Sequence, residues 1–84
     1  MVSRVVLFSH AKEDLAQLPQ KAREQIAHAV DDLGEFPGRR IGIKKLKAPF
    51  TGFRKRVGNC RILFDYVDTT VFIHRIKNRK DAYK

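Results

Sequence analysis

Cysteine is nearly absent from this chain of 84 residues, since Cys60 is the only one. A single thiol cannot form an internal disulfide, and an inert buried residue is a more common role for it than a nucleophile. The three histidines, His10, His28 and His74, are widely separated and form no cluster with metal-ligand spacing. The sequence therefore excludes a disulfide-stapled fold and gives no reason to expect a metal or another cofactor.

Long hydrophobic runs are also missing. The apolar run at residues 5–8 is much too short for a signal peptide or a membrane span. With the single cysteine, this predicts a reducing, cytoplasmic setting and no membrane partner. The chain shows no repeats and has room for one hydrophobic core, so residues 1–84 are expected to form one domain.

Acidic residues are scarce in the second half of the chain. The totals are 18 Lys and Arg against 9 Asp and Glu, a net charge of +9. Residues 1–42 carry six basic and six acidic side chains, whereas residues 43–84 carry twelve basic and three acidic ones. This concentration favours a polyphosphate partner, because neutralising phosphates releases counterions and supplies affinity. An ordinary solvated basic surface is the alternative.

A β-hairpin is the clearest local signal. Two β-prone runs flank Gly58-Asn59, and such a two-residue loop is typical of hairpins because Gly adopts positive φ without steric cost. This loop predicts two cross-strand pairs, Val57 with Cys60 and Arg56 with Arg61. Side chains alternate between faces along a strand. One face should then carry Arg54, Arg56 and Arg61, and the other the core residues Phe53, Val57, Cys60, Ile62 and Phe64.

Stacked arginines need an explanation. Like charges opposite each other in a sheet destabilise it by roughly 0.2–1 kcal/mol. An anionic ligand with several phosphates would offset that repulsion.

The first half of the chain reads as a strand followed by two helices. Residues 4–8 are β-branched and aromatic, and Ser9 is expected to be the N-cap of a short helix that Pro19 interrupts. Residues 20–33 predict a second helix, because apolar residues recur there at helical spacing. The expected buried stripe is Ala22, Ile26, Ala29, Val30 and Leu33.

The second half adds a basic connector and further strands. Residues 39–52 are expected to form an exposed loop around Pro49. Its lysines, Lys44, Lys45 and Lys47, form either a second phosphate-binding patch or a solvated loop. Residues 71–76 have apolar side chains on both faces, as expected of an interior strand.

The coarse order is therefore β-α-α-β-β-β. This order predicts an α+β fold, an antiparallel meander with a two-helix hairpin packed on one face. The opposite face, which carries the arginines, is left open to a ligand.

Three blocks of the chain resemble the RelE/ParE superfamily of bacterial and archaeal toxins. Residues 44–47 resemble the family's KLKG entry to the hairpin, and residues 53–64 resemble its aromatic-R-x-R-V-G-x-Y-R-aliphatic-x-Y block. Residues 78–83 are similar to its closing H-R-K-D-x-Y. The blocks occur in order and at family spacing, and the match covers nearly the whole chain.

The resemblance implies a RelE-like fold and a toxin function. RelE-like members are described as mRNA endonucleases of the ribosomal A site, neutralised by a cognate antitoxin encoded beside them. ParE-like members share the fold but target DNA gyrase. The expected partners are therefore mRNA, the ribosome and an antitoxin that is acidic at least in part. A non-catalytic basic RNA-binding module is a third interpretation, although most of the phenylalanines fall at core positions.

Matching positions imply site residues. The resemblance gives Arg54, Arg56, Arg61, Arg79 and Tyr83 as catalytic residues, and Lys44, Lys45, Lys47, Lys77 and Lys80 as RNA-binding residues. Whether Lys77 or Arg79 fills the last basic position stays open. Tyr83 either contacts RNA or caps the edge of the core. His74 is either a base or a structurally satisfied histidine, with no evident partner.

The chain departs from the family pattern at three positions. Lys55 stands where an aliphatic residue is usual on the core face, so its stem is expected to be buried with the ammonium at an edge. Cys60 replaces the common tyrosine, and Asn78 replaces a frequent histidine. The last change removes one acid/base group from the expected site.

Overall fold

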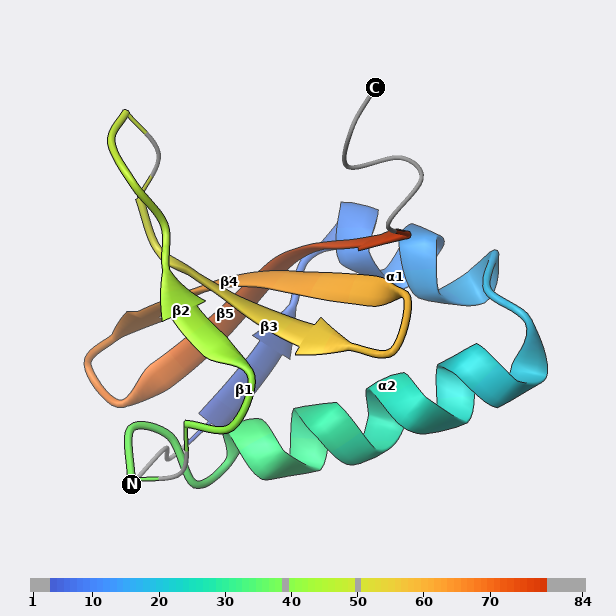
Figure 1. The fold of residues 1–84 in the computed structure, drawn as a ribbon, viewed down its shortest axis with the longest axis horizontal. Helices are drawn as coiled ribbons and strands as arrows, with labels where there is room; N and C mark the ends of the chain where they lie inside the picture. The colour runs from blue at the N-terminus through green and yellow to red at the C-terminus, as the bar shows by residue number, and fades with distance from the viewer. Residues whose placement is uncertain (1–3, 39, 50, 79–84) are drawn as a thin grey trace.

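In the part of the chain that the structure describes, five strands form one mixed sheet, and two helices precede most of it in the sequence (Figure 1). The computed structural model describes residues 4–38, 40–49 and 51–78. The elements are β1 (Arg4–Leu7), α1 (Ser9–Ala16), α2 (Gln20–Leu33), β2 (Ile43–Lys45), β3 (Phe53–Val57), β4 (Cys60–Val67) and β5 (Thr70–Asn78). Neither helix of these described residues is long and apolar enough to cross a membrane.

The strand order across the sheet is β1-β5-β4-β3-β2. β3, β4 and β5 form the predicted antiparallel meander, and β1 adds to β5 in parallel. Two-residue turns join the meander strands, with φ of 55° at Gly58, and 50° and 60° at Asp68 and Thr69. Positive φ at these turns matches the twist of the flanking strands. The α+β class and the meander are confirmed, and β5 is an interior strand as expected.

One face of the sheet packs on the core. The apolar parity of the strands directs Ile62, Phe64, Val71 and Ile73 to this face, where each is essentially inaccessible to solvent. The stripe of α2 covers them with Ile26, Ala29 and Leu33, while Ala22 and Val30 are half-buried. Burying a large aliphatic side chain stabilises a fold by about 1.5–3 kcal/mol. The opposite face, which we call the uncovered face, has no helix packed across it, and α1 borders it only beside β5.

The connector is not a simple loop, so that prediction was wrong. Residues Ile43–Lys45 form β2, an edge strand antiparallel to β3. Gly42, with φ of 72°, accepts a hydrogen bond from the Arg56 amide at 2.9 Å and so brings the chain alongside β3. A three-residue strand with two lysines has weak β-propensity of its own. Its conformation comes from pairing with β3, which local sequence does not reveal.

The start of α1 also differs from the prediction. Ser9 is the first helical residue, Phe8 occupies the N-cap, and no side chain caps the helix. The backbone explains the difference. The amide of Phe8 donates to the Ile73 carbonyl and so extends the β1–β5 pairing, while its carbonyl accepts from Lys12. Phe8 therefore makes the last backbone hydrogen bond between β1 and β5, and its carbonyl accepts the first backbone hydrogen bond of α1.

Candidate nucleic-acid interface

The β3–β4 hairpin has the predicted register. Val57 pairs with Cys60, and Arg56 pairs with Arg61. Arg54 lies two residues before Arg56 on the same face of β3, opposite Leu63 of β4. All three arginines therefore project from the face that neither helix covers. Cys60 lies on the core face, where burial raises the pKa of its thiol, as expected of an inert cysteine.

Neighbouring strands extend this basic surface. On β5, Lys77 pairs with Arg61, and on β2, Lys44 pairs with Arg54. We call this set the basic face: Lys44, Arg54, Arg56, Arg61 and Lys77. It draws on four strands whose residues lie up to 33 positions apart in the chain. Several fixed cations on a rigid sheet suit a polyanion, because arginine presents a planar fork to phosphate oxygens.

The structure separates the other predicted RNA-binding lysines. Lys45 pairs with Phe53, so it lies on the other face of the sheet from Lys44. Lys47 is exposed in the loop after β2. Lys77 pairs with Arg61 on the sheet, and the choice between Lys77 and Arg79 for the last basic position stays open. Arg79, Lys80 and Tyr83 lie outside the described residues, and their roles stay predictions.

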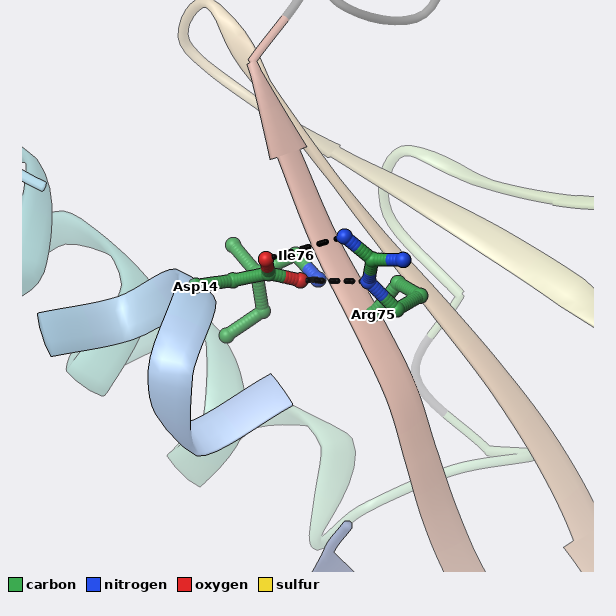
Figure 2. Close-up of polar contacts among 3 residues, drawn as sticks. All are labelled: Asp14, Arg75 and Ile76. Carbon is green, nitrogen blue, oxygen red and sulfur yellow. Dashed lines mark hydrogen bonds and ion pairs between the residues drawn. The ribbon is translucent and has the colours of Figure 1, made fainter. Parts of the chain in front are cut away.

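Arg75 also rises from β5 but has a different role (Figure 2). Its Nε and Nη2 donate to the two carboxylate oxygens of Asp14 in α1, at 2.8 and 3.1 Å. The same carboxylate accepts from the backbone amide of Ile76 at 2.9 Å. Hydrogen bonding from Arg75 lowers the pKa of Asp14, against the opposing effect of partial burial, and the pKa of Arg75 is raised in return. This pair fixes α1 against β5 and leaves Arg75 neutralised.

A second acid–base pair lies on the uncovered face. His74 Nε2 of β5 is 2.5 Å from Asp65 Oδ2 of β4. The two side chains are 41% and 34% exposed. Gly52, with φ of 94°, passes so close that a Cβ there would collide with the Asp65 carboxylate. Sequence reasoning identified no partner for His74, and the structure supplies Asp65. The bond agrees with the alternative of a structurally satisfied histidine. The β4–β5 register that joins the two residues was not predictable from the sequence.

Aromatic rings and two shallow hollows surround this pair. Phe8, which is 40% exposed, contacts the His74 ring edge-on at 4.8 Å between centroids, and the Phe72 ring at 5.8 Å. A hollow of about 430 Å³ is lined by Leu46, Pro49, Thr51, Leu63, Phe64, Asp65 and His74. Another of about 400 Å³ is lined by Phe8, Ser9, His10, His74 and Arg75. Among the described residues, no group of three His, Cys, Asp or Glu side chains is arranged to hold a metal ion.

Comparison with solved structures identifies the family. The toxin–antitoxin complex RelBE2 from Mycobacterium tuberculosis contains a chain that is 30% identical, with a TM-score of 0.81, covering 94% of this chain and 100% of that one. This chain belongs to the RelE/ParE superfamily of toxins. No family model matches the sequence, and no curated protein matches it either.

Other members of the superfamily agree in fold. A chain of the RelB–RelE antitoxin–toxin complex from Methanococcus jannaschii is 25% identical, with a TM-score of 0.79, over 93% of this chain and 94% of that one. A chain of the YoeB–YefM complex from Staphylococcus aureus is 21% identical, with a TM-score of 0.72, over 92% and 95% of the two chains. The last comparison supports the fold alone. The predicted RelE-like fold is therefore confirmed.

Departures from the superfamily pattern are accommodated locally. Lys55 is only 5% exposed on the core face, and its Nζ donates to the Ile41 carbonyl at 2.8 Å. The expectation of a buried stem and an ammonium at an edge is confirmed. Asn78 ends β5 opposite Cys60, where the superfamily pattern frequently has a histidine. The histidine of this chain's β5 lies four residues earlier, at His74.

Proposed function

We propose that this protein is the toxin of a toxin–antitoxin pair and that it cleaves mRNA on the translating ribosome without a metal ion. The observation that carries the proposal is the basic face, in which Arg56 directly opposes Arg61 and Lys77 extends the same row. Membership of the RelE/ParE superfamily supports the toxin class. The protein then acts in the cytoplasm, where its mRNA and ribosome partners are.

RNA supplies its own nucleophile for this reaction. The 2′-OH attacks the adjacent phosphorus, and the protein needs to orient that attack, stabilise negative charge on the phosphorane and move protons. In this proposal, Arg56 and Arg61 bind the non-bridging oxygens of one phosphate, which their cross-strand pairing supports. Arg54, one step along β3, is placed to position the neighbouring phosphate, with Lys44 beside it. Phe8 and Phe72 offer exposed or half-exposed rings at which an unstacked base can bind.

The cognate partner is an antitoxin. The similar structures from M. tuberculosis, M. jannaschii and S. aureus are complexes with antitoxins. The +9 charge of this chain, all of it in residues 43–84, favours a partner that is acidic at least in its C-terminal part. Such a partner would cover the basic face and block RNA from it.

Translation-coupled cleavage tests the proposal. The purified protein is added to ribosomes translating a defined mRNA in the presence of a metal chelator that spares the magnesium the ribosome needs, and cut sites are mapped. Discrete cuts within the translated frame are expected. Intact mRNA together with inhibited gyrase supercoiling would instead assign the protein to the ParE-like class.

A further inference from the structure

His74 occupies a bulge in β5. Leu63 pairs with Arg75, while the next residue, Phe64, pairs with Ile73, so His74 is the additional residue between them. Ile73 and Ile76 are both buried, although residues three apart in a regular strand face opposite sides of a sheet. The bulge thus turns His74 and Arg75 together onto the uncovered face. Bulges are over-represented beside active sites, where they redirect a side chain.

Asp65 determines which ring nitrogen of His74 carries the proton of their hydrogen bond. An ionised carboxylate only accepts hydrogen bonds, so Nε2 of His74 carries the proton of the 2.5 Å bond to Asp65. In the neutral ring this leaves Nδ1 with a lone pair. Phe8 packs edge-on against the ring and restricts its rotation. The result is an oriented imidazole with one nitrogen available as a proton acceptor.

The His74 side chain is accessible from solvent. His74 is 41% exposed and is shared by both hollows of the uncovered face. Strands in a sheet are about 4.8 Å apart, so the backbone of β5 lies roughly 10 Å from that of Arg54 on β3, with β4 between them. Long arginine side chains on β3 and β4 project from the same face as His74, and a base there has to come within hydrogen-bond reach of the 2′-OH next to the bound phosphate.

We propose that His74, oriented by Asp65, is the base that removes the 2′-OH proton in RNA cleavage. This assignment rests on the proposed function. The 2′-oxygen forms a bond to phosphorus as its proton passes to Nδ1 of His74, and the bond from phosphorus to the 5′-oxygen breaks. The 5′-oxygen takes a proton from solvent, which leaves a 2′,3′-cyclic phosphate and a 5′-hydroxyl. Asp65 is a positioning residue, and His74 is the catalytic one.

Within residues 4–38, 40–49 and 51–78, we consider the titratable or charged groups that face His74. They are Asp65 on β4, Arg75 on β5 and His10 on α1. Arg75 is bound to Asp14, and arginine does not lose its charge in the range where histidine titrates. His10 lines the same hollow as His74, so a His10 variant is the control for an effect of the neighbouring imidazole.

Single-turnover cleavage as a function of pH tests the assignment. His74→Gln keeps a hydrogen-bond donor for Asp65 but cannot accept the proton. Cleavage is expected to slow about 10²- to 10⁴-fold, with ribosome binding unchanged. The fall in rate at acidic pH, which protonation of the base causes in the wild type, should disappear. His10→Gln should keep that acid limb, and His28→Gln, on the exposed side of α2, should cleave as the wild type does.

Asp65→Asn provides a second test. It should slow cleavage while retaining an acid limb, because the base is still present but less well oriented. Added imidazole should restore part of the activity of His74→Ala, which a purely structural histidine would not allow.

The outcomes separate this inference from the proposed function. Wild-type rates and an unchanged pH profile in His74→Gln would overturn the assignment, while cleavage by the wild type would still support the nuclease. Should His74→Gln fail to fold, the Asp65→Asn profile and the imidazole rescue decide the matter. If the wild-type protein does not cleave mRNA at all, the proposed nuclease function is rejected.

Discussion

Arg56 and Arg61 lie directly opposite each other across the β3–β4 hairpin. Opposed like charges weaken a strand pair by roughly 0.2–1 kcal/mol. A phosphate bound between the two guanidinium groups would relieve this repulsion. The proposed RNA binding would therefore offset the cost of this cross-strand pair.

Arg61→Ala should lower the rate of mRNA cleavage by about a hundred- to a thousand-fold, equivalent to roughly 2.7–4 kcal/mol of transition-state stabilisation. The fold should persist, because the core face of β4 is unchanged. Arg61→Lys should recover only part of the rate, since an ammonium cannot reproduce the planar fork. Arg23→Ala, on the exposed surface of α2, is the matched control and should cleave normally. Equal rates for Arg61→Ala and the control would contradict this role.

Asp14→Ala should destabilise the protein by about 1–3 kcal/mol, because it removes the acceptor of the Ile76 amide and the Arg75 guanidinium. Chemical denaturation at neutral pH measures the change. Asp14→Asn should lose less stability, since its side-chain amide oxygen can still accept a hydrogen bond from the Ile76 amide.

The same carboxylate should contribute a pH dependence of stability. The folded state lowers the pKa of Asp14, so the unfolded chain binds a proton more readily at acidic pH. The stabilisation is therefore present above the pKa of an unfolded aspartate, about 3.9. It is lost as the pH falls through the lower pKa of the folded state. Asp14→Asn should remove this contribution, which unfolding curves across the acid range will show. If the unfolding free energies of the wild type and Asp14→Asn change with pH in parallel, Asp14 makes no such contribution.

The antitoxin should bind rapidly at low ionic strength. Opposite charges on the two partners speed their encounter. Salt weakens this attraction, because the Debye screening length falls from about 10 Å at 0.1 M salt to about 3 Å at 1 M. The product of the neighbouring open reading frame is expected to copurify with this protein, and stopped-flow association should slow as salt is added. A pull-down from the native host that recovers no small acidic protein would count against this partner.

The hairpin was predictable because two local rules agree on it. The Gly58-Asn59 loop sets the pairing, and the apolar alternation of β4 sets the parity, so the three arginines follow without tertiary information. The stripe of α2 was predictable for a similar reason, since its 3.6-residue period is complete within the helix.

Long-range contacts account for what the sequence did not reveal. β2 pairs with β3 through a short lysine-rich segment, and Asp14 meets Arg75 across 61 positions of the chain. The Asp65–His74 pair depends on a bulge that shifts the β4–β5 register by one residue. Alternation alone predicts an unbroken strand and cannot indicate where an extra residue is inserted.

The chemical nature of the cut ends tests the central claim most directly. mRNA cleaved on translating ribosomes, with a chelator that spares ribosomal magnesium, is analysed for both new termini. Attack by the 2′-OH predicts a 2′,3′-cyclic phosphate or a 3′-phosphate, with a 5′-hydroxyl on the downstream fragment. A 3′-hydroxyl paired with a 5′-phosphate would contradict the account, and so would mRNA left intact while gyrase supercoiling is inhibited.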